Sequence, residues 1–201
     1  MLANATYLDI TVIPKRARRL TDGEPTSGEI VVIGDREWLI GEGSSYATGH
    51  GVEVDEWECR NGHARAYLLR EGGSRVEWLF AREVPLDSIT TGSGVAFTRC
   101  LTHADVPTKL TYREEIYQFE AKSYASYRDV EGQRTAKTVE EYYNPARQSK
   151  LSVERWPDGR VECYHERYLS ADDVEVRAGG WMKHVRSASA ALSALCGRSR
   201  A

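Results

Sequence analysis

An internal repeat is the feature that most constrains how this chain can fold. The tripeptide Ser45-Tyr46-Ala47 recurs as Ser123-Tyr124-Ala125 at an offset of 78 residues, and beyond Ala125 the offset becomes 85. A single insertion of seven residues after Ala125 accounts for this change. At the larger offset the matching segments are 55–57 with 140–142, Arg70 with Arg155, 75–77 with 160–162, and 87–89 with 172–174. The pattern predicts two diverged copies of one unit of about 70 residues.

Turn residues agree with this repeat. The segment Gly72-Gly73-Ser74 falls on Pro157-Asp158-Gly159, a different sequence that reverses the chain equally well. Residues 28–40 predict a hairpin, because the apolar run 30–33 and the segment 37–40 flank the two-residue turn Gly34-Asp35. In the second copy Arg113-Glu114 takes the place of that turn. We therefore expect short strands joined by tight turns in both copies.

The predicted fold is mainly β, with two tandem pseudo-equivalent antiparallel β units. A barrel-like or sandwich form is expected, because short strands must close or stack to cover their edges. A C-terminal helix should follow, since one apolar stripe recurs at helical spacing. The stripe consists of Trp181, Val185, Ala188, Leu192 and Leu195.

The chain divides into five predicted parts. These are an N-terminal strand and basic segment at 1–27, the first β repeat at 28–89, a linker with a possible strand (95–101) at 90–109, the second β repeat at 110–177, and the amphipathic C-terminal helix and tail at 178–201.

Composition predicts a folded, water-soluble chain in the cytoplasm. Hydrophobic residues make up 41% of the sequence, and no apolar run approaches the roughly 18 residues of a membrane span. Residues 7–13 are short, contain Asp9 and precede the basic run, which does not resemble a secretory signal. The four cysteines are scattered without CxxC pairing, which favours reduced thiols. The net charge of −3 gives no general attraction to nucleic acid.

No catalytic group, metal site or cofactor is predicted. Three Cys/His pairs have spacings that zinc could use, but the repeat places them at unrelated positions in the two copies. These pairs are Cys59 with His63, Cys100 with His103, and Cys163 with His165. The glycine-rich segment 41–45 lacks the lysine of a phosphate-binding loop and contains Glu42, so a bend in a strand is the favoured interpretation.

Two sets of residues are candidate binding sites. The first would line a pocket between the two β repeats, where an arginine beside aromatic rings suits a charged ligand. It consists of Glu56, Trp57, Glu154, Arg155 and Trp156. A simpler interpretation of Glu154 is a cross-strand ion pair on the wet face of a sheet.

The second set is the basic run Lys15, Arg16, Arg18 and Arg19, which could contact an anionic surface. It allows peripheral membrane contact. A nucleic-acid partner is not favoured, since aromatic residues fall at strand positions where core packing explains them.

Several segments together resemble a known family. They are Glu56-Trp57-Glu58-Cys59, Ala66-Tyr67-Leu68-Leu69-Arg70, residues 110–117, residues 150–156, and Val161-Glu162-Cys163-Tyr164. Across about residues 30–176 the chain is similar to the bacterial domain of unknown function DUF4178. This resemblance implies a β-rich protein without assigned activity, often encoded beside polyamine-synthase-like proteins and membrane-stress components.

The expected function is a non-enzymatic binding or assembly protein of a bacterial envelope-stress or polyamine-associated gene system. It would act through contacts with another protein or through self-association. The alternative is a small-ligand-binding protein, or an enzyme, with a pocket between the two β repeats. The pocket idea requires that Glu154 and Arg155 are not fully exposed and that the copies enclose a cavity.

Overall fold

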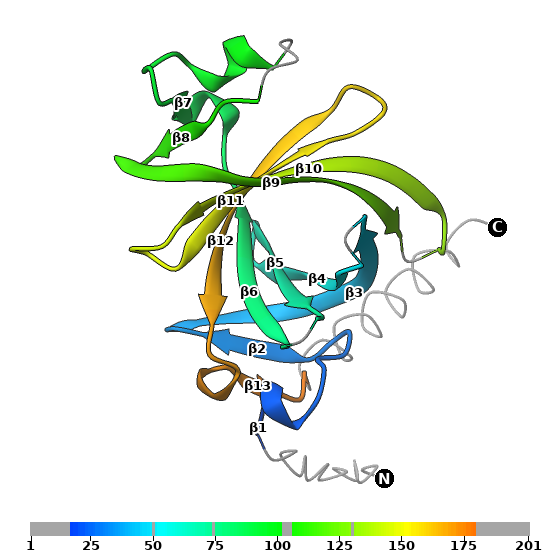
Figure 1. The fold of residues 1–201 in the computed structure, drawn as a ribbon. Helices are drawn as coiled ribbons and strands as arrows, with labels where there is room; N and C mark the ends of the chain where they lie inside the picture. The colour runs from blue at the N-terminus through cyan, green and yellow to red at the C-terminus, as the bar shows by residue number, and fades with distance from the viewer. Residues whose placement is uncertain (1–16, 50, 74, 102–105, 130, 180–201) are drawn as a thin grey trace, which may run out of the picture.

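The computed structural model describes residues 17–179, apart from residues 50, 74, 102–105 and 130. These residues form one antiparallel sheet of thirteen strands, in the order β1-β13-β2-β3-β4-β5-β6-β12-β11-β10-β9-β8-β7 (Figure 1). The predicted mainly β fold is confirmed. The predicted C-terminal helix lies outside the described residues, as do residues 1–16 of the predicted N-terminal strand and basic segment at 1–27.

The elements follow one another in a regular series along the chain. They are β1 (Arg18–Arg19), η1 (Leu20–Asp22), β2 (Ile30–Ile33), β3 (Arg36–Thr48), β4 (Glu53–Asn61), β5 (Ala64–Glu71), β6 (Glu77–Glu83), η2 (Leu86–Ser88), β7 (Ile89–Thr91), η3 (Phe97–Cys100), β8 (Lys109–Tyr112), β9 (Glu115–Arg128), β10 (Arg134–Asn144), β11 (Ser149–Arg155), β12 (Val161–Leu169), η4 (Ala171–Asp173) and β13 (Glu175–Arg177).

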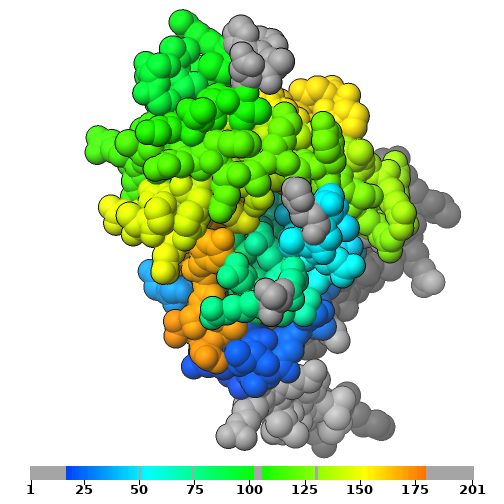
Figure 2. All heavy atoms as spheres, in the orientation of Figure 1, coloured from blue at the N-terminus to red at the C-terminus, as the bar shows by residue number. Residues whose placement is uncertain are grey.

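Two strand sets with the same order of elements make up most of this series. We call β2–β7 with η2 the first set and β8–β13 with η4 the second set; a 3₁₀ turn precedes each, η1 before the first set and η3 before the second. The last strand of each set pairs with the first strand of the other, β7 with β8 and β13 with β2. In Figure 2 most of the second set, green to yellow, lies above most of the first set, blue to cyan, and the orange end of the second set reaches down beside it.

Two further pairings join the sets and close a circuit of strands. β6 pairs with β12, and the far ends of β3 and β9 pair with Tyr46 opposite Tyr127. Eight strands thus follow one another as neighbours and return to the start, in the order β3-β4-β5-β6-β12-β11-β10-β9. The circuit has an inner and an outer side, and side chains alternate between them along each strand.

The predicted hairpin within residues 28–40 is confirmed, with Ile33 opposite Arg36 across the turn. The possible strand within the 90–109 linker is wrong, because residues 97–100 form the 3₁₀ turn η3. That turn inserts the fully buried Phe97 beneath β7 and β8, which an extended segment would not do.

The glycine-rich segment 41–45 bends β3 by a bulge. The register between β3 and β4 shifts between Ile40 and Gly43. A side chain at Gly43 would meet Trp57 Nε1 at 3.1 Å, so the indole occupies the space that a larger residue needs. β9 and β10 show a corresponding shift at Glu141. Bulges increase twist, which lets long strands curve around the circuit.

Three hydrophobic clusters stabilise this arrangement. One lies on the outer side of the first set and includes Trp38 and Phe80. Another lies on the outer side of the second set and includes Phe97 and Leu151. A smaller cluster lies inside the circuit and includes Leu79. The large outer clusters leave the inner surface free to carry polar groups.

Candidate functional site

Strand alternation sends charged side chains into the circuit. On β11, Leu151 and Val153 join the outer cluster, while Lys150 and Glu154 lie on the opposite, inner side. All of these side chains are buried. β11 therefore alternates apolar and polar residues, and its polar side faces the protein interior instead of water.

Lys137 on β10 lies in an aromatic cage. Its Nζ atom is 4.1 Å from the ring centre of Tyr46 and 5.2 Å from those of Tyr127 and Trp156. It also donates a 2.5 Å hydrogen bond to Glu154 Oε1. The side chain of Lys137 is only 1% exposed. Desolvated ammonium groups gain most from such aromatic faces, so the cage is built to hold a cation.

Lys150 forms a second buried cationic centre. Its Nζ atom lies 2.5 Å from Glu71, 3.0 Å from Glu141 and 3.5 Å from Glu166. Burial alone would lower the pKa of Lys150, but the three carboxylates outweigh burial and raise that pKa well above its usual value. Lys150 is therefore charged throughout the physiological range.

A small cavity is lined by both strand sets and by Glu154 and Glu166, the partners of Lys137 and Lys150. Its volume of about 10 Å³ is room for one group the size of a water molecule. The lining residues are Tyr46, Glu56, Tyr67, Leu69, Ala81, Glu154, Tyr164 and Glu166. Three carboxylates thus line one small, partly open cavity, from β4, β11 and β12.

Two of these carboxylates hold protons more strongly than usual. Burial raises the pKa of Glu56, and Lys137 opposes that rise. Burial raises the pKa of Glu166 to about 7, with Lys150 opposing and Glu71 adding to the rise. Glu166 Oε2 is buried and makes no hydrogen bond among the described residues. The cavity therefore has more buried carboxylate than its own cations satisfy.

The tyrosines around the cavity remain protonated. Burial raises the pKa of Tyr67 to about 12 and raises the pKa values of Tyr46 and Tyr164 further above their usual range. Tyr164 donates its hydroxyl proton to Glu162 at 3.0 Å. These rings supply apolar and aromatic walls with no additional charge.

The predicted pocket residues separate into two groups. Glu56 and Glu154 both line the cavity, and Trp156 borders the Lys137 cage. Trp57 instead stacks on Trp78 in the outer cluster, with ring centres 5.9 Å apart. Arg155 is on the outer side, where it pairs with Glu140. The prediction that all five converge is wrong, because consecutive strand residues point to opposite faces.

Glu154 forms a cross-strand ion pair, as the simpler interpretation predicted, but the pair does not lie on a wet face. Its partner is Lys137 on the neighbouring strand β10, but the pair is buried instead of wet. Glu154 is 7% exposed and the Arg155 side chain is 23% exposed, so neither is fully exposed.

None of the described cysteines lines the cavity. Cys59 and Cys163 are buried in the two outer clusters, and burial raises both thiol pKa values, that of Cys59 to about 12. Within the described part of the chain no group of three or more His, Cys, Asp or Glu side chains could hold a metal ion. His103 lies outside that part.

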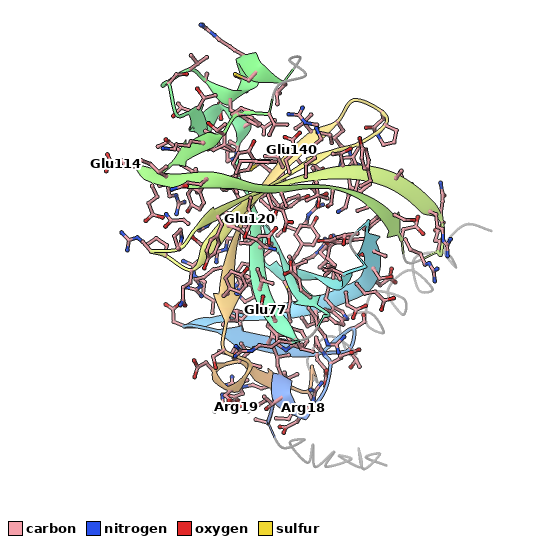
Figure 3. The ribbon with its side chains drawn as sticks, in the orientation of Figure 1. Arg18, Arg19, Glu77, Glu114, Glu120 and Glu140 are labelled. Carbon is pink, nitrogen blue, oxygen red and sulfur yellow. The ribbon has the colours of Figure 1, made fainter. Side chains whose placement is uncertain are left out.

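The basic run is only partly described, since Lys15 and Arg16 fall outside the described residues. Arg18 hydrogen-bonds the Gly23 carbonyl at 2.6 Å and pairs with Glu29 at 2.8 Å, so its charge is locally engaged. Arg19 is exposed. Figure 3 shows both arginines on β1, at the opposite end of the molecule from Glu140.

Sequence reasoning missed Lys137, Lys150, Tyr46 and Glu166 as site residues. Lys137 falls within the insertion that separates the two repeat offsets, so the repeat comparison gave it no counterpart. The segment Lys150-Leu151-Ser152-Val153-Glu154 alternates polar and apolar residues, which indicates a strand with one polar side. The same pattern is typical of a strand whose polar side faces water, so it did not identify a buried site.

The fold and this interior define a β protein whose two strand sets enclose a charged, aromatic-lined cavity. The family model described as "Domain of unknown function (DUF4178)" matches residues 26–171, so the chain belongs to that family, as its motifs predicted. No curated protein and no solved structure matches the chain. Across the described residues, no helix combines the length and apolar character needed to cross a membrane.

Proposed function

We propose that this protein is a non-enzymatic binding protein that takes up a cationic amine group between its two strand sets. The observation that carries the proposal is the convergence of Glu56, Glu154 and Glu166 on one buried cavity. Buried carboxylates are costly unless they are paired. An ammonium group supplies the missing positive charge and up to three hydrogen-bond donors.

Charge balance supports an amine over an anion. The three lining carboxylates lie beside two buried ammonium groups, those of Lys137 and Lys150, and Lys150 is shared with Glu71 and Glu141. Further positive charge would offset the excess of carboxylates and give a hydrogen-bond donor to Glu166 Oε2, which lies 3.5 Å from Lys150 Nζ without a hydrogen bond. The raised pKa of Glu166 agrees with this, since burial favours its protonated form.

The size of the cavity restricts which amine fits. Its 10 Å³ accommodates one ammonium head group and nothing larger. The aromatic cage shows how such a head group is held, since Lys137 already occupies one. The cavity is partly open, so the rest of a linear amine would extend outside it while the head group lies inside.

The test uses 1,4-diaminobutane as the probe and 1,4-butanediol as its neutral analogue in titration calorimetry. We expect binding of the diamine only, and a loss of about tenfold in affinity for Glu56→Gln, the equivalent of about 1.4 kcal/mol. The exposed Glu120→Gln is the matched control and should leave affinity unchanged. Equal binding of the diol, or equal losses in both variants, would rule out the amine site.

A second candidate function is self-association or assembly with another protein through β9. Three large apolar side chains of this strand are exposed, namely Ile116, Phe119 and Tyr124, at 56%, 37% and 75%. Exposed aromatic residues of this kind are enriched in protein interfaces. This role matches the expected assembly function.

If β9 mediates assembly, Tyr124→Ser should weaken the complex by about tenfold or more, as for a typical aromatic interface residue. Analytical ultracentrifugation of the full chain checks this through the concentration dependence of its mass. Val76→Ser is the control, since Val76 is 46% exposed and lies far from β9 in the sequence. A chain that stays monomeric at all concentrations and retains no partner contradicts the assembly role.

The wider setting is part of the same proposal. We place the protein in the cytoplasm of a bacterium, within an envelope-stress or polyamine-associated system, as the family resemblance implies. Three free thiols, Cys59, Cys100 and Cys163, support a reducing location. The equal order of elements in the two strand sets supports an origin by tandem duplication.

A further inference from the structure

Four arginines gather on the outer side of the β6–β12 pairing. Arg82 on β6 lies opposite His165 on β12, and Arg167 is two residues further along β12. Arg36 follows the turn between β2 and β3, and Arg113 lies in the turn between β8 and β9. Figure 1 shows both hairpin turns reaching the same side of the molecule. We call Arg36, Arg82, Arg113 and Arg167 the arginine patch.

The arginine patch concentrates positive charge without neutralising partners. Each of its four arginines is exposed, and none has a carboxylate oxygen within 4.0 Å among the described residues. Burial lowers the pKa of Arg82, and repulsion from the other three arginines lowers it further. Arg82 thus lies within electrostatic range of the other three arginines, and such repulsion is relieved when an anion lies between like charges.

An aromatic floor lies beneath these guanidinium groups. Arg82 is 5.2 Å from the ring centre of Trp38, and Arg113 is 5.1 Å from that of Tyr112. The rings of Tyr112 and His165 are 5.6 Å apart. Trp38 Nε1 and His165 Nε2 are buried and have no hydrogen-bond partner among the described residues. Two nitrogen atoms thus remain unsatisfied directly below the charges.

The backbone of Arg113 has an unusual conformation for a residue other than glycine. Arg113 has φ of 50°, a conformation that favours glycine, and the corresponding turn of the first set uses Gly34 at φ of 64°. Keeping a long charged side chain in such a conformation costs stability. Glu114 shares this conformation, with φ of 65°, so the turn holds the Arg113 side chain in one fixed direction.

We propose that the arginine patch binds a phosphate group. Guanidinium groups match phosphate oxygens with two parallel hydrogen bonds each, and they stack on aromatic rings while doing so. Both strand sets contribute, through Arg36 and Arg82 from the first and Arg113 and Arg167 from the second. The site is on the outer side of the circuit, so it is independent of the proposed amine site inside.

The probe is inorganic tripolyphosphate, titrated into the full chain and followed by calorimetry. The double variant Arg82→Gln/Arg167→Gln should lose at least about tenfold in affinity, the effect of losing one or more charge-assisted hydrogen bonds. The matched control is Arg75→Gln/Arg99→Gln, which removes the same charge from two exposed arginines outside the patch. Its affinity should change by less than about twofold, because only distant charge is lost.

Vesicles distinguish a lipid headgroup from a free phosphate. Co-sedimentation with phosphatidylcholine vesicles containing phosphatidylglycerol, lost in Arg82→Gln/Arg167→Gln, assigns the site to a headgroup phosphate. Binding of tripolyphosphate without vesicle binding assigns it to a free phosphate or polyphosphate. Absence of binding to both probes overturns the proposal. Equal losses in the patch variant and in the control also overturn it, since they show only general charge attraction.

Discussion

Replacing Lys137 by methionine is expected to lower the free energy of unfolding by about 3–5 kcal/mol, the cost of leaving one member of a buried ion pair without its partner. The variant leaves Glu154 buried at the cavity with no ammonium group within bonding distance in the cage. The free energy of unfolding lost in Lys137→Met therefore measures how strongly the buried Glu154 carboxylate requires a cation. Urea unfolding at neutral pH, with linear extrapolation, gives this difference directly.

Two comparisons identify the cause of that loss. Lys122→Met removes a half-exposed lysine whose partner, Glu140, keeps Arg155, and should cost less than about 1 kcal/mol. The double variant Lys137→Met/Glu154→Leu should recover most of the lost stability, because apolar replacements of buried ion pairs are often neutral. If Lys137→Met costs no more than Lys122→Met, Glu154 does not depend on the caged ammonium group.

Local parts of this fold follow directly from the sequence. The hairpin at residues 28–40 is encoded by one apolar run and a two-residue turn, and the structure forms it in the expected register. Turns of this kind depend only on neighbouring residues. The contact between β3 and β9 joins segments about 80 residues apart, as at Tyr46 and Tyr127, and no local pattern specifies it.

The position of the polar interior could not be read from the same patterns. A period of two indicates that Glu154 and Arg155 face opposite sides, but it does not indicate which side meets water. Closure of the circuit decides this, because it buries the inner side, where Glu154 lies. The sequence predicted that Glu56 and Glu154 line one pocket, whereas the roles of Lys150 and Glu166 in the interior are seen only in the structure.

Stability should fall as the pH rises through the range governed by Glu166. Burial raises the pKa of this carboxyl in the folded protein to about 7, from an ordinary value of 4.5. Between these values the folded protein holds a proton that the unfolded chain has released, so a rise in pH favours unfolding. The full loss is about 3 kcal/mol, since each unit of pKa corresponds to about 1.4 kcal/mol. Urea unfolding from about pH 5 to about pH 8 measures it.

Glu166→Gln should abolish most of this slope, because the amide has no charge to bury at any pH in the range. The exposed Glu120→Gln should retain the slope of the unmodified protein. Saturating 1,4-diaminobutane should reduce the slope as well, since a bound ammonium group favours the charged carboxylate and lowers its pKa. A slope that Glu166→Gln leaves intact would assign the titration to another buried group, such as Glu56, whose pKa burial also raises.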